Sequence, residues 1–313
     1  MATIHYVSGV RLLNADQMGI GSEARARDTR GSSAPDAPVL ANNDHRVPLL
    51  KALVKGYGGL ILTGPPGTGK TWLAGELAAE LTGNTDNQME FVQFHQSYQF
   101  EDFMEGYRPN EDGGGGFTYR PGVFLRLVGK AKKPENHDRD FVIVIDELSR
   151  ADVGRVFGEA LTYVDRDKRG QGFTLPSGRS CSIPHNVYVI ATMNPLDRGV
   201  DEIDAAFERR FAKFDMPPDR EQLESILGGL DEQLRRRVVG WFDKTNSKAR
   251  TLNEPQLMVG HAYFVHVSDV QSLHDRWEYQ LKFHVERALR HEPALYAEIV
   301  NGWNRIFSDP EQG

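Results

Sequence analysis

Apolar and polar positions along the chain change their spacing near residue 219, and this divides the sequence into two parts. Before that point, short apolar runs alternate with stretches in which apolar residues recur every three or four positions. The runs are Leu60–Leu62, Glu90–Phe94, Phe141–Ile145, Val187–Thr192 and Phe211–Phe214. Near-continuous apolar strands alternating with helices are typical of a parallel sheet buried on both faces. We therefore predict an α/β fold with a parallel sheet.

Helical spacing accounts for the segments between these runs and for most of the chain after residue 219. Between the runs, the helical patterns are Val123–Lys132, Val153–Val164 and Asp201–Arg209. After residue 219 the predicted helices are Arg220–Leu227, Asp231–Asp243, Asp275–Arg290 and Glu292–Ile306. Helices without intervening strands indicate a separate unit. We predict an α/β core over residues 46–217, followed by a small helical domain over residues 218–313.

Two stretches depart from this order. Residues 20–45 are rich in glycine, alanine, serine and proline and hold almost no large apolar side chains. Because this composition is typical of a linker, residues 1–45 are predicted to be a short N-terminal segment and flexible linker. Asp165–Pro184 is rich in glycine and charge, with short extended pieces at Phe173–Leu175 and Cys181–Ile183. We interpret it as a β-hairpin inserted into the core.

Overall composition narrows the class of protein. The chain has 313 residues, 39% of them hydrophobic, which is enough for an ordinary globular core. A net charge of −7 argues against a generally basic nucleic-acid-binding protein, and one cysteine excludes an internal disulfide. No apolar run reaches the length of a membrane span, and the first residues lack a signal-peptide pattern. We expect a cytoplasmic protein that does not enter a membrane.

The candidate chemistry begins directly after the first apolar run, in a segment that fits the phosphate-binding loop G-x-x-x-x-G-K-[ST]. Its residues are Gly64, Pro65, Pro66, Gly67, Thr68, Gly69, Lys70 and Thr71. The glycines let consecutive backbone N–H groups turn towards a polyphosphate. Lys70 can reach the β- and γ-phosphates, and the Thr71 hydroxyl can ligate Mg²⁺. The helical pattern that follows adds the positive end of its dipole, so we predict a nucleotide site here.

Two carboxylates follow the apolar strand Phe141–Ile145. Asp146 can hold Mg²⁺, directly or through water, and Glu147 can orient and polarise the attacking water. The alternative is a strand with a solvated acidic end. The intact phosphate-binding loop earlier in the chain favours the functional roles.

Polar groups at the ends of the last core patterns complete the candidate site. Asn194 ends the fourth apolar strand. It can hydrogen-bond the γ-phosphate or the attacking water, or cap the turn before Pro195. Arg209 and Arg210 close the last helical pattern of the core. An arginine there can reach the γ-phosphate of a neighbouring subunit, or it can complement the helix dipole. Spacing alone does not decide between these two roles.

The order of these segments resembles that of the AAA+ nucleoside triphosphatases. Several stretches more closely resemble one branch, the McrB-type motor subunits of modification-dependent restriction systems. These stretches are Phe91–Pro109, Val144–Glu159, Pro184–Arg198 and Gly260–Phe264. The resemblance covers roughly residues 46–265. It implies an AAA+ P-loop core with a parallel sheet, followed by a small helical lid domain.

The resemblance also implies a site shared between subunits. AAA+ proteins assemble as rings, usually hexamers, with nucleotide bound between neighbours. The loop, both carboxylates and Asn194 would lie on one subunit, and the two arginines on the next. McrB-type proteins prefer GTP and carry an Asn-x-x-Asp motif, whose ends are kept here by Asn194 and Asp197, with Pro195 and Leu196 between them. Asp197 is therefore an expected nucleotide-binding residue, and the expected cofactors are Mg²⁺ with GTP or ATP.

Partners follow from the same resemblance. In McrB-type systems the nuclease lies on a separate McrC-like chain, which binds the ring and stimulates hydrolysis, and DNA is contacted through the complex. The expected function is a ring-forming GTP- or ATP-hydrolysing motor of a DNA restriction and anti-phage complex. The alternative is a ring ATPase that remodels or chaperones a protein, as MoxR-type relatives do. The segment Phe91–Pro109 and the Asn194 and Asp197 pair favour the first.

Overall fold

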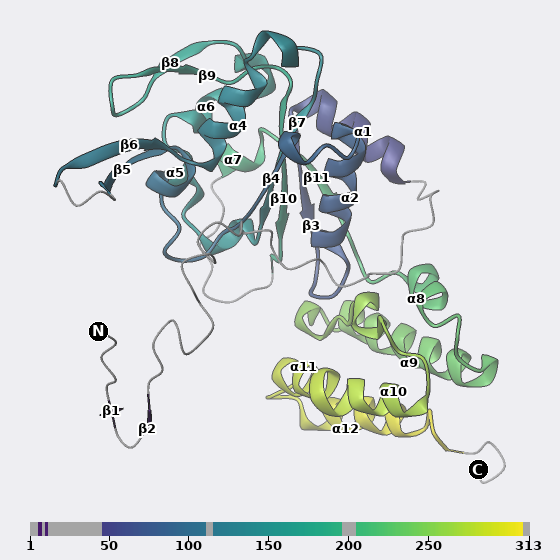
Figure 1. Ribbon diagram of the computed structural model, residues 1–313. Coiled ribbons are helices and arrows are strands. Elements are labelled where there is room, and N and C mark those ends of the chain that lie inside the picture. The colour runs from purple at the N-terminus through teal and green to yellow at the C-terminus, as the bar shows by residue number, and fades with distance from the viewer. Residues whose placement is uncertain (1–5, 8–9, 12–45, 111–114, 196–204, 309–313) are drawn as a thin grey trace. The chain divides into compact units, whose positions relative to one another are not determined.

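A parallel sheet forms the centre of the larger of two units, Asn43–Gly313. The computed structural model describes residues 6–7, 10–11, 46–110, 115–195 and 205–308. The sheet has five strands: β3 (Gly59–Thr63), β4 (Met89–Gln93), β7 (Phe141–Asp146), β10 (Val187–Met193) and β11 (Ala212–Asp215). They lie in the order β11-β3-β10-β7-β4 (Figure 1). The predicted α/β fold with a parallel sheet is confirmed. In the smaller unit, β1 (Tyr6–Val7) pairs antiparallel with β2 (Val10–Arg11).

Strand β10 lies between β3 and β7, and its register brings their carboxyl ends to one edge. Met193 pairs with Thr63, the last residue before the phosphate-binding loop. On the other side, Ala191 pairs with Ile145, so the residue after Ala191 lies level with Asp146. This edge is where ligands bind in open parallel sheets.

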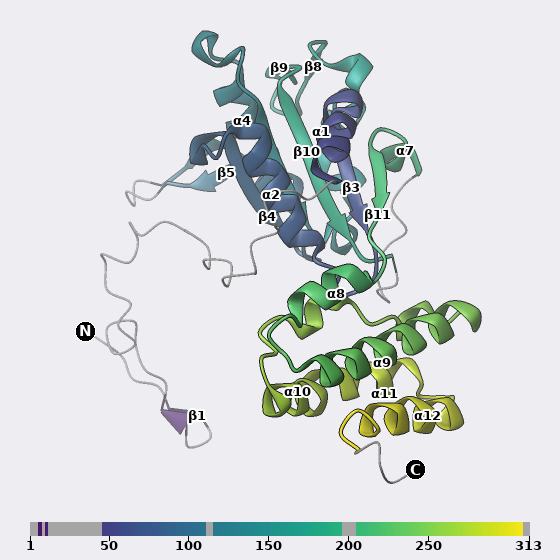
Figure 2. The same cartoon turned by 90° about the vertical axis from the view of Figure 1, so that its right-hand side faces the viewer.

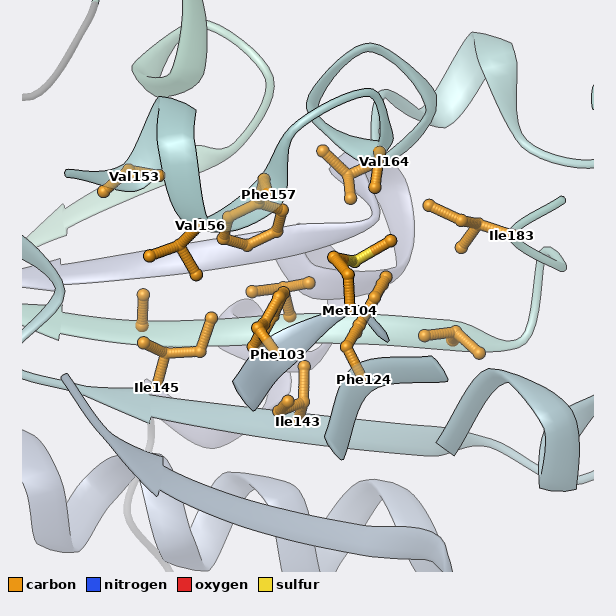
Figure 3. Packing of buried hydrophobic residues seen from close by; sticks show 14 of the residues in the cluster. Phe103, Met104, Phe124, Ile143, Ile145, Val153, Val156, Phe157, Val164 and Ile183 are labelled. Atoms are coloured by element: carbon orange, nitrogen blue, oxygen red, sulfur yellow. The ribbon is translucent and has the colours of Figure 1, made fainter. Parts of the chain in front are cut away.

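Both faces of the central strands β3, β10 and β7 are buried, as their apolar sequences predict, whereas the edge strands β4 and β11 are partly exposed. Helices α1 (Arg46–Tyr57) and α2 (Lys70–Thr82) pack on one face (Figure 2). On the other face, Ile145 of β7 belongs to an apolar cluster with Phe103 and Phe157 (Figure 3). That face carries α3 (Phe100–Phe103), α4 (Val123–Ala131), α5 (Val153–Phe157), α6 (Ala160–Tyr163) and α7 (Ala205–Glu208).

The pattern Val153–Val164 forms two short helices, α5 and α6, where the sequence predicts one. Gly158 separates them, with φ of 51°, a region that residues with side chains rarely adopt. A Cβ there would lie 2.8 Å from the ring of Phe100. The prediction of one helix was wrong because apolar periodicity does not show this close contact from another segment.

Two antiparallel hairpins extend from the core. The first, β8 (Gly172–Thr174) with β9 (Ser180–Ser182), lies where the sequence predicts a hairpin insertion. The second, β5 (Glu105–Pro109) with β6 (Phe117–Pro121), was not predicted. Its strands contain proline, glycine and arginine rather than an alternating apolar pattern, so the usual strand signal is weak.

The two hairpins contact each other. Ser177, in the turn of the first, donates its hydroxyl to Glu105 Oε2 at 2.9 Å and its backbone N–H to Oε1 at 3.0 Å. The Arg179 guanidinium carbon lies 3.3 Å from the centre of the Tyr119 ring. A carboxylate bond and a cation–π contact therefore fix the tip of one hairpin on the other.

A buried arginine fixes the root of the first hairpin. Arg169 is 4% exposed. Its guanidinium donates to the carbonyls of Val164 at 2.9 Å, Val187 at 2.7 Å and Gly58 at 3.2 Å. Burial lowers its pKa to about 10, so it is still charged at neutral pH. Several charge-assisted bonds to carbonyls offset the cost of burying that charge.

Helices make up the chain after β11. They are α8 (Arg220–Ile226), α9 (Glu232–Thr251), α10 (Val270–Arg276), α11 (Lys282–Ala288) and α12 (Pro293–Asn304). A π-helical turn, Trp277–Leu281, joins α10 to α11, and α9 continues beyond the predicted end at Asp243. Trp303 is central to their apolar core, with its ring centre 4.8 Å from those of Trp241 and Trp277.

Candidate nucleotide-binding site

The phosphate-binding loop connects β3 to α2, which begins at Lys70. The Lys70 ammonium donates to the backbone carbonyls of Gly64 and Pro65, both at 2.9 Å. The buried Thr68 hydroxyl also donates to the Pro65 carbonyl, at 3.0 Å. These bonds curl the loop around its own lysine. The first N–H groups of α2 have no acceptor within the helix and are suited to an anion.

Two glycines of the loop are required by its backbone and by its neighbours. Gly64 has φ of 147° and Gly67 has φ of 73°, values that favour glycine. A Cβ on Gly64 would overlap the backbone carbonyl of Met216, and one on Gly67 would lie 2.7 Å from the Tyr263 ring. The loop is therefore packed against residues that follow the sheet in sequence.

Asp146 is held by two hydroxyl groups at the edge of the sheet. Its Oδ1 accepts from Thr71 Oγ1 at 2.7 Å and from Thr192 Oγ1 at 2.6 Å. Thr192 Oγ1 in turn accepts from the backbone N–H of Glu147 at 3.2 Å. One threonine of β10 therefore positions both carboxylate residues, and Asp146 lies beside the last residue of the loop.

These oxygen groups fit Mg²⁺. The described residues contain no group of three or more histidines, cysteines and carboxylates that could hold a metal by themselves. Mg²⁺ usually takes one or two protein oxygens and completes its shell with water and substrate phosphates. The Thr71 hydroxyl and the Asp146 carboxylate supply such oxygens directly beside the phosphate-binding loop.

Glu147 lies just beyond β7, in a left-handed backbone conformation with φ of 55° and ψ of 46°. Such values are uncommon for residues with side chains and carry strain at many functional sites. Its Oε2 accepts from Arg150 Nε at 3.1 Å, and its side chain is 30% exposed. The carboxylate is thus accessible to water at the edge where the loop ends, and an arginine neutralises it.

The other predicted residues lie in different surroundings. Asn194 is buried and directly follows β10, which places it level with the start of the loop. Arg209 and Arg210 follow α7, which ends at Glu208, so they lie in the turn before β11 and do not close a helix as predicted. Arg209 is exposed and Arg210 partly buried. Asp197 lies outside the described residues.

A segment of the helical part contacts the loop directly. Gly260 approaches so closely that a Cβ on it would overlap the backbone of Gly67. The N–H of Ala262 donates to the Gly67 carbonyl at 2.8 Å. His261, between them, is 7% exposed, and its Nδ1 accepts from the N–H of Asp219 at 3.2 Å. We call residues 260–264 the lid segment.

Sequence reasoning missed two contributors to this site. Thr192 lies within an apolar strand, and only the register of β10 shows that it reaches Asp146. A polar side chain near the end of a buried strand was the available signal. His261 lies in the stretch Gly260–Phe264, which contributed to the family resemblance but gave no predicted site residue. Its contact with the loop depends on the tertiary fold.

Comparisons with known proteins agree with this geometry. A family model described as the AAA domain (dynein-related subfamily) matches residues 59–211, which include the loop, both carboxylates, Asn194 and both arginines. Within the residues that the structure describes, no helix is both long and apolar enough to cross a membrane.

Two curated relatives belong to restriction enzymes. The type IV methyl-directed restriction enzyme EcoKMcrB subunit of Escherichia coli (strain K12) is 37% identical over 220 residues, which cover 66% of this chain and 47% of that protein. The type II restriction enzyme BsuMI component YdiS of Bacillus subtilis (strain 168) is 29% identical over 164 residues, which cover 47% of this chain and 46% of that protein. The chain therefore spans about half the length of these relatives.

A crystal structure of a candidate ATPase from Cytophaga hutchinsonii has a TM-score of 0.38 and 17% sequence identity, covering 67% of this chain and 66% of that chain. The family match, the identity to the restriction-enzyme relatives, and the parallel core with its phosphate-binding loop identify the chain as an McrB-like AAA+ protein.

Proposed function

We propose that the chain hydrolyses GTP or ATP as the ring-forming motor subunit of a DNA restriction complex. The observation that carries the proposal is the bonding of Thr71 and Thr192 to one oxygen of Asp146, with Glu147 on the next residue. This arrangement joins the phosphate-binding loop to two carboxylates across β10.

Each residue has a role that follows from its place. Lys70 would leave its carbonyl partners for the β- and γ-phosphates, because a phosphate oxygen is the stronger acceptor for an ammonium. Thr71 and Asp146 would hold Mg²⁺, whose chemistry is to neutralise charge on the phosphates. Glu147 would orient the attacking water, and Asn194 would bond that water or the γ-phosphate.

Hydrolysis would also require a second copy of the chain. Arg209 is exposed in the turn before β11, which suits a guanidinium that reaches a neighbouring site in a hexameric ring. Arg210, partly buried beside it, is the second candidate. An arginine supplied from outside the site stabilises the charge of the transition state.

The proposed partner is a McrC-like chain that carries the nuclease, and DNA would be contacted through the complex. Support comes from the restriction-enzyme relatives, which are a subunit and a component of larger enzymes. Asp197 is the proposed contact to a guanine base, so the choice between GTP and ATP is part of the test.

The test compares GTP and ATP turnover by the wild-type chain and two variants, with and without the adjacent gene product. We expect Lys70→Ala to abolish nucleotide binding in calorimetry. Glu147→Gln should bind nucleotide and assemble normally, with turnover reduced about 100-fold or more, because general-base contributions are of that order. Near-normal turnover by Glu147→Gln would remove it from this role. A metal-binding adhesion-type partner instead of a nuclease would favour a MoxR-like remodelling ATPase.

A further inference from the structure

His261 is a buried polar side chain that lies against the phosphate-binding loop. It is 7% exposed, between Gly260 and Ala262, which both contact Gly67. Its Nε2 lies 3.8 Å from the position that a Cβ of Gly69 would occupy. The Nε2 edge of the ring therefore faces the loop at Gly69, whose missing side chain leaves this edge uncovered.

The bonding of the ring fixes which nitrogen carries the proton. His261 Nδ1 accepts a hydrogen bond from the backbone N–H of Asp219 at 3.2 Å. A neutral imidazole that accepts at Nδ1 has its N–H at Nε2. Burial lowers the pKa of His261 to about 4, so the ring is neutral at physiological pH. Nε2–H is thus a donor that faces the loop.

Within the described residues His261 Nε2 has no hydrogen-bond partner. The atom is not among the fully buried side-chain atoms without a partner, so this edge of the ring is open to a ligand. A second histidine, His284 in α11, shows the ordinary arrangement: its Nε2 lies 3.0 Å from the carbonyl oxygen of Met258. Burial also lowers the pKa of His284. A donor on a largely buried ring gains from an acceptor placed at its open edge, and a ligand seated on the loop can supply that acceptor.

We propose that His261 is a nucleotide-binding residue, whose Nε2–H donates to a nucleoside di- or triphosphate seated on the loop beside Gly69. The inference rests on the proposed nucleotide-hydrolysing function. The acceptor is an oxygen or nitrogen on the nucleoside side of the β-phosphate: an α-phosphate oxygen, a ribose hydroxyl or purine N7. A bond of this kind links lid and loop only when nucleotide is present.

Calorimetric titration of the full chain with GDP and ADP, in Mg²⁺, tests this. His261→Phe keeps a ring and removes the donor, and we expect it to weaken the binding by about five- to ten-fold, as the loss of one net hydrogen bond does. His261→Gln can place an amide N–H near Nε2 and should recover most of the affinity. His284→Phe, the matched control, should bind as the wild type does.

Analogues locate the acceptor. If purine N7 accepts, the 7-deaza nucleotide binds wild type weakly and His261→Phe equally weakly. If a ribose hydroxyl accepts, the 2′-deoxy or the 3′-deoxy nucleotide behaves in that way. If a phosphate oxygen accepts, His261→Phe weakens the binding of every analogue by the same factor as it weakens the binding of the parent nucleotide.

Three results would overturn the proposal. They are unchanged affinity in His261→Phe, equal losses in the two phenylalanine variants, and no recovery with His261→Gln. A wild-type chain that binds neither nucleotide would instead contradict the proposed function itself.

Discussion

At the scale of single residues, the site depends on the hydroxyl of Thr192, a residue that lies outside the phosphate-binding loop and outside the pair of carboxylates. Thr192 donates to Asp146 and accepts from the backbone N–H of Glu147. It therefore holds the expected Mg²⁺ ligand and the expected general base in a fixed relation. The strained backbone of Glu147 needs such support, since its conformation is unfavourable in isolation.

Replacement of Thr192 by valine keeps the side-chain shape and removes both bonds. We expect the free energy of unfolding to fall by about 1–3 kcal/mol, because the Glu147 N–H loses its acceptor. Turnover should fall while nucleotide affinity stays near that of the wild type. Thr82→Val is the control, since Thr82 is also buried and its hydroxyl bonds only within α2. Equal turnover in Thr192→Val and the wild type would contradict the assigned role.

His261 predicts how stability depends on pH. Its folded pKa of about 4 lies below the ordinary 6.5, chiefly because of burial; Asp219 raises the value and Arg46 lowers it. Between pH 4 and pH 6.5, His261 is protonated in the unfolded chain but stays neutral in the folded protein. Stability is therefore full above pH 6.5 and lost as the pH falls towards 4, by at most about 3 kcal/mol.

Urea unfolding of the wild type and His261→Phe across this pH range isolates the contribution. The stability difference between the two proteins should change below pH 6.5 and stay constant above it. His284, whose pKa is lowered in the same direction, is present in both proteins. A constant difference from pH 7 to pH 4 would show that His261 is not buried as a neutral group.

At the scale of elements, contact between the lid segment and the loop rests on glycines. Gly260 has ordinary backbone angles, φ −75° and ψ 150°, which any residue can adopt. Glycine is needed at this position because the backbone of Gly67 lies too close to leave room for a side chain. The lid segment can lie on the loop only because neither glycine carries a side chain at the contact.

Gly260→Ala should therefore separate the lid segment from the loop. We expect a loss of about 1–3 kcal/mol in the free energy of unfolding, typical of an overpacked position, together with weaker nucleotide binding. Gly240→Ala, within α9, has nothing within 4 Å of the added Cβ and should be neutral or slightly stabilising. Denaturant unfolding and calorimetry measure both effects. A Gly260→Ala protein as stable and as tight-binding as wild type would refute the contact.

The sequence predicted the parts of the fold and site that depend on local pattern. Apolar runs gave the sheet, and the glycine-lysine spacing indicated the loop. Asp146 and Glu147 were identified because they end a strand. Two features were missed because they depend on distant neighbours: the contact of Thr192 with Asp146, which follows from strand register, and the break at Gly158, which follows from the contact with Phe100. The β5–β6 hairpin was missed because its local strand signal is weak.

At the scale of the whole molecule, the proposed hydrolysis draws on residues from three separate parts of the chain. The loop and carboxylates lie on the sheet, the lid segment belongs to the helical part, and the proposed arginines lie before β11. Arg209 would serve a neighbouring subunit rather than its own site.

Mixing experiments can test this sharing. Arg209→Ala or Arg210→Ala alone should lose most turnover, because an arginine finger contributes about 1,000-fold or more. Mixed with Lys70→Ala, part of the activity should return, because some interfaces then combine an intact loop with an intact arginine. Turnover is measured against the mixing ratio, with Glu147→Gln plus Lys70→Ala as the control that restores nothing. No recovery at any ratio would argue against a trans arginine.

The buried Arg169 also decides how the hairpin formed by β8 and β9 should be shortened when its role is tested by deletion. Excising residues 165–184 would delete the guanidinium that holds the carbonyls of Val164, Val187 and Gly58. A loss of activity after such a deletion would then report damage to β3 and β10 as much as loss of a surface. Shortening only the tip between Phe173 and Cys181 keeps this internal anchor and removes instead the contacts of Ser177 with Glu105 and of Arg179 with Tyr119.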